Sequence, residues 1–302
     1  MDDVTDTVFR RVIAELAKPD LFFTEFVNVD GLQSPGRETV IKRLRFSATE
    51  QPLIAQIWGL RPENFYKTAK ELVDMGFSGV DLNFGCPEKA VVKNGACIAL
   101  VNNRELAGEI IASTKAGIAG RIPLSVKTRL GFNEIDFTWH KFLLEQGLDM
   151  LTVHGRTRKE LSKVPAHWDE IGKVRQLRDD MNLKTLIVGN GDVVSREQGE
   201  RLAKKYKLDG IMIGRGVFSD PFVFAPVSPW SDYSKEQRIA LYTKQVKLFK
   251  ETWKENERSV HVLNKFCKVY INGYDGAKDD REKLMRAGSA EELLTILSDL
   301  LS

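Results

Sequence analysis

The first 225 residues alternate short apolar runs with amphipathic stretches, and this alternation restricts the possible folds more than any other feature. Seven runs are predicted to be strands: 21–27, 53–57, 78–83, 124–128, 149–153, 185–188 and 209–213. Helical patterns lie between them, for example at 63–76, 104–117, 137–147, 168–179 and 196–206. Strands that alternate with helices at this spacing form a parallel sheet covered by helices. The strands are apolar almost throughout, which indicates burial on both faces of the sheet.

The expected architecture is an α/β fold, a (β/α)8 TIM barrel, which needs eight strands. The chain opens with MDDVTDTVFRRVIAELAK, a loop that leads into a helix with Thr5 or Asp6 as its N-cap. The first strand would therefore lie before Met1. Because a barrel with a gap exposes unpaired strand edges, we expect that the sequence is truncated there and that the strand belongs to the fold.

The pattern changes after Pro221. Residues 225–234, APVSPWSDYS, are typical of a linker, and helical patterns follow from Ser234 onward. Apolar side chains recur there at spacings of three and four: Ile239, Tyr242, Val246, Phe249 and Trp253, then Val260, Leu263, Cys267 and Tyr270. Ser289 with Glu292 matches a capping box. We therefore predict a barrel domain at 1–225 and a small helical-bundle domain at 234–302.

The composition is that of an ordinary soluble protein, with 42% hydrophobic and 29% charged residues. No apolar run approaches the length of a membrane span, and no leader peptide opens the chain. The three cysteines are an odd number without C-x-x-C spacing, so neither a disulfide framework nor a zinc site is expected. These features predict a cytoplasmic protein without a metal. The net charge of +3 permits a polyanionic partner but does not imply one.

Polar residues gather where the predicted strands end, which is where TIM barrels carry their chemistry. They are Gln56, Asn83 and Cys86, Lys127, His154, the loop GNGD at 189–192 and the loop GRG at 214–216. The two glycine loops follow the last two predicted strands, the usual place for a phosphate site in a barrel. Arg215 could add a charge-assisted contact, although both loops could also be tight turns. The lack of a strand-linked G-x-G-x-x-G gives no support to a Rossmann dinucleotide site.

Three of these residues have competing interpretations. Lys127 could be a Schiff-base nucleophile, an anion ligand or a lysine at the edge of the core, and the cost of burying it unpaired favours an anionic neighbour. His154 could be a general acid, a phosphate ligand or a structural histidine, and we favour the ligand. Cys86 could be a small buried hydrophobe. Its polar, glycine- and proline-bounded loop instead favours a thiol near its ordinary pKa of about 8.5, which acts as a general acid, or a nucleophile if that pKa is lowered. Cys97 and Cys267 are interpreted as packing residues.

Five segments taken together resemble the tRNA-dihydrouridine synthases: DLNFGCP at 81–87, SVKTRLG at 125–131, TVHGRTR at 152–158, GNGDV at 189–193 and IGRG at 213–216. The resemblance extends over essentially the whole chain, and the opening MDDVTDTVFR is similar to the first βα loop of that family. It implies an FMN enzyme that reduces a uridine of tRNA to 5,6-dihydrouridine with electrons from NADPH.

The resemblance also implies roles for individual residues. Cys86 would protonate C5 of the uracil as reduced flavin delivers hydride to C6, and Asn83 would contact the uracil. Gln56 and Lys127 would hold the flavin ring. Other residues would hold the ring, the ribityl chain or the phosphate: His154, Asn190, Gly191, Asp192, Gly214 and Arg215. Met1 and Asp2 would lie in the first flavin-contacting loop.

The helical domain would then bind tRNA. Between Ser234 and Tyr270 there are nine Lys and Arg residues against four Asp and Glu. Arg258, His261, Lys265 and Lys268 follow a 3-4-3 spacing that predicts one shared helix face. Without the resemblance this face would be interpreted as merely solvated. With it, we expect phosphate contacts and a monomeric protein. Two other functions stay open: an FMN-barrel oxidoreductase acting on a small pyrimidine-like molecule, and a tRNA-binding relative that has lost catalysis.

Overall fold

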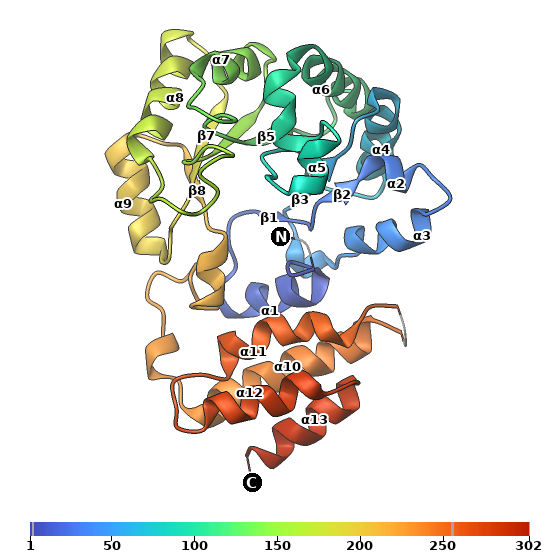
Figure 1. Ribbon diagram of the computed structural model, residues 1–302, viewed down its shortest axis with the longest axis vertical. Helices are drawn as coiled ribbons and strands as arrows, with labels where there is room; N and C mark the ends of the chain where they lie inside the picture. Colours follow the sequence, from blue (N-terminus) through green and yellow to red (C-terminus); the bar gives the residue numbers. More distant parts are fainter. Residues whose placement is uncertain (2, 255–256, 302) are drawn as a thin grey trace.

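The computed structural model describes residues 1, 3–254 and 257–301. One parallel sheet curls through the N-terminal part of the chain, and helices cover its outer side (Figure 1). Its strands are β1 (Phe22–Phe23), β2 (Val27–Asn28), β3 (Leu53–Trp58), β4 (Gly79–Phe84), β5 (Leu124–Arg129), β6 (Met150–His154), β7 (Leu186–Asn190) and β8 (Gly210–Met212). They follow the order β1-β3-β4-β5-β6-β7-β8, with β2 also paired to β3.

The predicted TIM-barrel class is confirmed, with seven strand positions around the curl among the described residues. Each crossover between neighbouring strands carries a helix, as parallel pairing requires. The covering helices are α4 (Pro62–Asp74), α6 (Arg104–Ile118), α7 (Phe137–Glu145), α8 (Trp168–Asp180) and α9 (Arg196–Tyr206). Their bounds lie close to the sequence predictions, because each has an apolar stripe that faces the sheet.

The prediction of one continuous strand at 21–27 is wrong. It forms two two-residue strands, β1 and β2, which both pair with β3. Between them, the Thr24 hydroxyl accepts the hydrogen bond of the Gln56 N–H at 3.0 Å, so a side chain replaces a backbone carbonyl in the ladder. This departure from regular pairing leaves Glu25 fully buried and facing the C-terminal helices, where it meets Arg258.

Shorter helical segments connect the main elements. They are α2 (Val29–Leu32), α3 (Arg37–Val40), η1 (Ile41–Leu44), η2 (Ala48–Glu50), α5 (Lys89–Lys93), η3 (Cys97–Asn102), η4 (Arg215–Phe218), η5 (Trp230–Asp232) and η6 (Val260–Leu263). The predicted linker contains η5, whose Trp230 is buried and lies beneath the Arg238 guanidinium. This segment is therefore anchored by packing along part of its length.

The N-terminal helix α1 (Thr7–Ala17) joins the sheet to the C-terminal helices. Asp6 is its N-cap and accepts a hydrogen bond from the Phe9 N–H at 2.9 Å. Arg10, on the buried side of α1, forms an ion pair with Glu50 at 2.6 Å, and both side chains are almost fully buried. The Thr7 hydroxyl also donates to Glu50. These bonds fix α1 against the segment that precedes β3.

In the described residues after the linker there are four α-helices: α10 (Lys235–Thr252), α11 (Asn264–Tyr270), α12 (Ala277–Arg286) and α13 (Ala290–Asp299). Figure 1 shows them packed together beneath α1, at the end of the molecule that holds the C-terminus. The apolar stripe predicted for α10 is buried, and so are Leu263, Cys267 and Tyr270. No helix within the described ranges is long and apolar enough to cross a bilayer.

Candidate active site

The side chains predicted to carry chemistry lie at the carboxyl ends of the strands, and the strand register identifies neighbours. Asn83 of β4 pairs with Lys127 of β5, and His154 of β6 pairs with Asn190 of β7. Because alternate residues of a strand face the same side, Asp81 lies on the face that carries Asn83. The parallel strands thus bring these groups together at one rim of the sheet.

A buried carboxylate organises the amides at this rim. Asp81 is fully buried and accepts two hydrogen bonds, from Ser125 Oγ at 2.6 Å and from Gln56 Nε2 at 2.7 Å. The Gln56 carbonyl then accepts a hydrogen bond from Asn83 Nδ2 at 3.2 Å. Burial raises the pKa of Asp81 to about 6, against the opposing effects of Ser125, Gln56 and Lys127. Asp81 therefore fixes which end of the Gln56 amide faces Asn83.

Hydrogen bonds with two side chains, Asn83 and Arg129, fix the loop that carries Cys86. Asn83 Oδ1 accepts hydrogen bonds from the backbone N–H groups of Gly85 at 3.1 Å and Cys86 at 3.0 Å. On the other side, Arg129 Nε donates to the Gly85 carbonyl at 2.9 Å. Arg129 is buried and also donates to the Thr157 and Leu161 carbonyls. The position of Cys86 is thus set by side chains from β4 and β5.

The environment of the Cys86 thiol corrects one expectation. Its pKa is not near the ordinary value but is lowered to about 6, first by a hydrogen bond from the Cys97 side chain and then by the Glu88 N–H and Arg129, against burial. Cys97, interpreted from the sequence as a packing residue, is buried but lies against Cys86. In the unliganded protein, Cys86 is therefore mostly a thiolate at neutral pH. When it is protonated, it is a stronger acid than an ordinary cysteine thiol.

Lys127 is a cation without a partner in the described part of the chain. No hydrogen bond or ion pair of its ammonium group is formed there, although Asp81 lies close enough to act on its charge. Burial and, less strongly, the charge of Arg129 lower the pKa of Lys127 to about 8, against the opposing effects of Asp81 and Cys86. Lys127 is therefore still mostly charged at pH 7, and its ammonium is available for an anionic ligand.

A second group of cations surrounds His154. Burial lowers the pKa of His154 to about 2, with further contributions from Lys127, Arg129, Arg156 and Arg215. Arg156 Nη1 lies 3.2 Å from His154 Nε2. Since a guanidinium only donates, Nε2 is the acceptor and the ring proton lies on Nδ1. A neutral imidazole is a poor general acid, so the ligand role that we favour and the structural role stay open for His154.

Asp192 organises the first glycine loop rather than adding free negative charge. Its carboxylate forms ion pairs with Arg156 and, at 3.7 Å, with Arg215, and it accepts the Ala166 N–H at 2.9 Å. Burial opposes ionisation, but the bonds from Arg156 and Ala166 lower the pKa of Asp192 below its usual range. The nearby Asn190 amide donates to the Met212 carbonyl at 2.8 Å, which ties β7 to β8.

Glycine is needed at specific points of these loops. Gly191 has a φ of +134°, and a Cβ there would lie 2.7 Å from the Ala166 Cβ. A Cβ at Gly216 would overlap the Val193 carbonyl oxygen. At Gly214, by contrast, a Cβ would have no neighbour within 4 Å. The backbone at Gly214 therefore borders open space, as it must if a ligand is to approach it.

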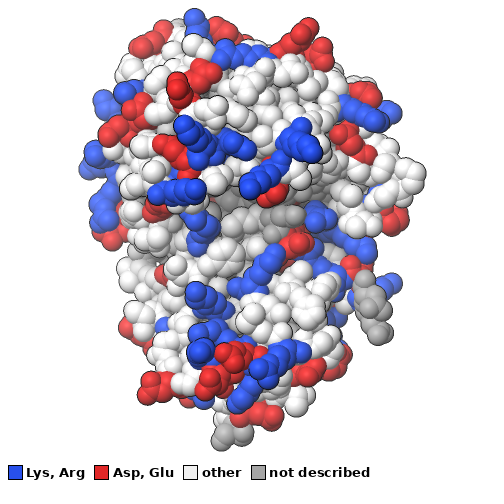
Figure 2. Space-filling view, viewed as in Figure 1, with Lys and Arg blue, Asp and Glu red and all other residues white. Residues whose placement is uncertain are grey.

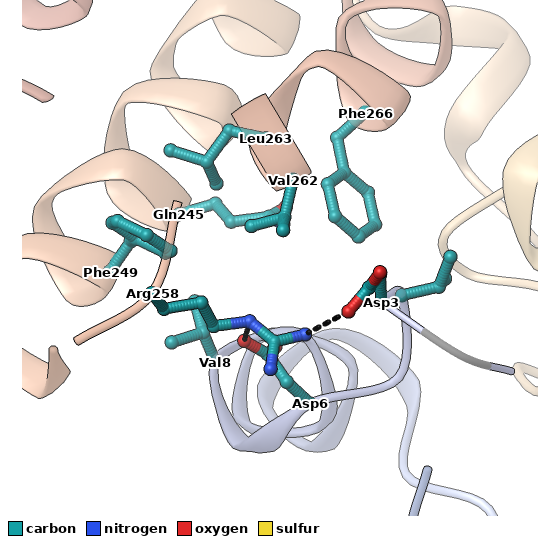
Figure 3. Close-up of a pocket in the computed structure, with 10 residues that line it drawn as sticks. Asp3, Asp6, Val8, Gln245, Phe249, Arg258, Val262, Leu263 and Phe266 are labelled. Carbon is teal, nitrogen blue, oxygen red and sulfur yellow. Dashed lines mark ion pairs between the residues drawn. The ribbon is translucent and has the colours of Figure 1, made fainter. Parts of the chain in front are cut away.

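The structure corrects the placement of Arg258. It lies before η6 and outside α11, so it does not share a helix face with Lys265 and Lys268. Its side chain is 10% exposed and pairs with Glu25 at 2.9 Å and Asp6 at 3.3 Å. Figure 3 shows it pointing at Asp6 and Asp3 from between the C-terminal helices and α1. Arg258 thus connects the C-terminal helices to the N-terminal part.

The remaining residues predicted to bind substrate or cofactor lie outside the rim, near the N-terminus and on the C-terminal helices. Lys265, Lys268 and His261 are exposed, and Lys265 donates to the Asp3 carbonyl at 3.3 Å. Met1 is partly buried, and its amino group donates to Thr5 Oγ1 at 2.7 Å, in the turn before α1. Asp2 lies outside the described residues. Figure 2 shows Lys and Arg side chains on both sides of the hollow between the C-terminal helices and the rest of the molecule.

Four contributors to the site were not identified from the sequence: Asp81, Arg129, Arg156 and Cys97. Two of them could have been found from their spacing. Asp81 lies two residues before Asn83, and Arg129 lies two residues after Lys127, and a separation of two places side chains on the same face of a strand. Within the described residues, no cluster of three or more His, Cys, Asp or Glu side chains could hold a metal ion.

Comparisons with known proteins identify the family to which the chain belongs. Residues 1–300 match the family model described as dihydrouridine synthase (Dus). A probable tRNA-dihydrouridine synthase of Staphylococcus aureus (strain COL) is 45% identical over 302 residues, which cover 99% of this chain and 90% of that protein. The probable tRNA-dihydrouridine synthase 2 of Bacillus subtilis (strain 168) is 41% identical, over 99% of this chain and 91% of that protein.

Among solved structures, histamine dehydrogenase from Rhizobium sp. 4-9 superimposes with a TM-score of 0.51 at 13% sequence identity. The superposition covers 82% of this chain and 47% of that protein. At this level of identity the similarity concerns the fold alone.

Proposed function

Because the chain belongs to the dihydrouridine synthase family, we propose that it reduces a uridine of tRNA to 5,6-dihydrouridine. The names of the S. aureus and B. subtilis relatives support tRNA as the substrate. The observation that carries the proposal is the placement of Cys86, on a loop held by Asn83 and Arg129 at the rim where Lys127 offers a free charge.

The residues of this rim fit FMN, which we assign as the cofactor with NADPH as the electron donor. An unpartnered ammonium on Lys127 and the excess of cations around His154 suit an anionic, phosphate-bearing ligand. Gln56 and Lys127 would hold the flavin ring, with Met1 in the adjoining loop. The remaining ligands would be His154, Asn190, Gly191, Asp192, Gly214 and Arg215. When bound, FMN would supply the hydride that adds to C6 of the uracil.

Cys86 would supply the proton to C5 of the uracil. Addition at C6 builds negative charge on the C5 and carbonyl side of the ring, and a proton at C5 removes that charge. A base that binds beside Cys86 displaces water from the thiol, which raises its pKa and favours the protonated form. After transfer, the thiolate accepts the hydrogen bond from Cys97. Asn83, whose amide orientation is fixed through Gln56 by Asp81, would position the base.

The substrate must be delivered by the rest of the protein. The target base has to leave its stack to reach a buried rim. We propose that residues 234–302 form the tRNA-binding part, with the exposed Lys265, Lys268 and His261 contacting phosphates. Such contacts predict salt-sensitive binding that depends on RNA shape more than on sequence. A tRNA substrate also implies a cytoplasmic enzyme, which we propose acts as a monomer.

The test is an assay of the purified chain with FMN, NADPH and unmodified tRNA, followed by nucleoside mass spectrometry. Dihydrouridine in the tRNA and none from free uridine is the expected result. Reduction of free uridine or uracil but not of tRNA would replace the proposal with a small-molecule oxidoreductase. Binding of tRNA without dihydrouridine, in a protein whose spectrum shows bound FMN, would indicate a relative that has lost catalysis.

A further inference from the structure

Two of the three cysteines lie together at the active site, although they are 11 positions apart in the chain. Cys86 follows β4, and Cys97 begins η3. η3 packs against β4, and the Cys97 side chain lies within hydrogen-bonding reach of the Cys86 side chain and backbone. The third cysteine, Cys267, lies in α11 among the C-terminal helices, where it contacts the Tyr242 hydroxyl at 3.1 Å.

The backbone is bent in an unusual way to bring Cys97 to this place. Cys97 has a φ of +55°, in the left-handed region that residues with a Cβ rarely occupy. Gly95, two residues earlier, is also left-handed, with a φ of +85°. A non-glycine residue in this conformation is strained and persists where surrounding structure enforces it, commonly at functional sites. The turn therefore holds a second thiol beneath the first.

The two thiols differ in access. Cys86 is partly exposed at the rim, whereas Cys97 is 2% exposed. A small oxidant from solvent would reach Cys86 first. Cys97 would then be the thiol placed to react with the product, because its side chain lies beside that of Cys86. An exposed thiol with a second thiol in contact is the arrangement of redox-sensitive cysteine pairs.

We propose that Cys86 and Cys97 form a reversible disulfide when a peroxide oxidises Cys86, and that this disulfide blocks the active site. In the first step the Cys86 thiolate attacks one oxygen of hydrogen peroxide, the O–O bond breaks, and sulfenic acid and hydroxide form. In the second step the Cys97 sulfur attacks the Cys86 sulfur, its proton joins the leaving hydroxyl group as water, and the S–S bond forms. The thiols lose two electrons in total, and the peroxide gains them. The consequence for activity, though not the disulfide itself, rests on the function proposed above.

Peptide mapping of the full-length protein tests the disulfide directly. Trypsin separates the two cysteines, since cleavage after Lys70, Lys89, Lys93 and Arg104 leaves Cys86 in peptide 71–89 and Cys97 in peptide 94–104. After treatment with a few equivalents of hydrogen peroxide and blocking of free thiols with N-ethylmaleimide, peptides 71–89 and 94–104 should appear as one linked species. Dithiothreitol should separate them, and Cys267 should carry the blocking group throughout.

Two variants complete the test. Cys267→Ser should give the same linked peptides as the wild type. Cys97→Ala should give none, and continued peroxide should convert Cys86 to sulfinic acid, which dithiothreitol does not reverse. Wild-type protein in which Cys86 is oxidised to sulfinic acid without linked peptides, or stays unoxidised, would overturn the proposal. These readouts do not depend on tRNA reduction, so linked peptides in a protein that fails to reduce tRNA would refute the proposed function alone.

Discussion

Replacing Arg258 with alanine should destabilise the protein rather than only weaken its contact with RNA. The Arg258 guanidinium neutralises two carboxylates that have little access to water: Glu25 is fully buried and Asp6 is 6% exposed. Removing one partner of a buried ion pair costs about 3–5 kcal/mol, because the other charge is left uncompensated. For a chain of this length, 1 kcal/mol corresponds to about 2 °C of melting temperature, so the midpoint should fall by roughly 6–10 °C.

The loss should also depend on pH. Burial already raises the pKa of Asp6 above its usual range, while Arg258 opposes the increase. Without Arg258 that pKa rises further. A carboxyl whose folded-state pKa exceeds its unfolded value loses stability as the pH rises through that interval, since the folded state must release a proton that it holds more tightly. The destabilisation of Arg258→Ala should therefore be larger at pH 8 than at pH 5.

Thermal unfolding followed by circular dichroism, at both pH values, measures this effect. Lys268→Ala is the matched control, because an exposed lysine should change stability by no more than about 0.5 kcal/mol. An Arg258→Ala protein that melts with the wild type while losing tRNA affinity as Lys268→Ala does would refute the structural role. Arg258 would then belong to the RNA-binding surface after all.

Three further predictions concern the rim and the RNA surface. The rate of Cys86 alkylation by iodoacetamide should rise with pH around a midpoint near 6, since Cys97 and the surrounding groups lower the pKa of the thiol to about 6. Cys97→Ala should move this midpoint upward. An unchanged midpoint would contradict the role of the Cys97 hydrogen bond. Asp81→Ala should lower kcat at least tenfold, because the Gln56 amide is then free to turn. Asp81→Asn should recover part of this loss. If both variants were as active as the wild type, the amide network would be dispensable. Lys268→Ala should reduce the slope of log K for tRNA against log salt by about 1, measured by filter binding, and an unchanged slope would exclude a phosphate contact.

Much of the site could be predicted because it depends on regular structure. Asn83, Lys127 and His154 lie at strand ends, and parallel strands bring those ends to one rim whatever the details of the loops. The apolar stripe of α10 was equally predictable, since a period of three to four residues defines a buried helix face.

What could not be predicted depends on irregular backbone. The contact between Cys97 and Cys86 follows from left-handed residues in a loop, which no periodicity encodes. The face assigned to Arg258 assumed one continuous helix, whereas η6 begins at Val260 and α11 at Asn264. Strand 21–27 divides because the Thr24 hydroxyl replaces a ladder carbonyl, a tertiary contact that a strand pattern cannot show.

The most direct test of the account is the single-turnover rate of dihydrouridine formation by Cys86→Ala, measured on tRNA with chemically reduced enzyme. If Cys86 donates the proton to C5, the rate should fall by about 10²- to 10⁴-fold, the usual contribution of a general acid, while the Kd for tRNA stays within about twofold of the wild type. A Cys86→Ala protein that forms dihydrouridine at the wild-type rate would contradict the central claim.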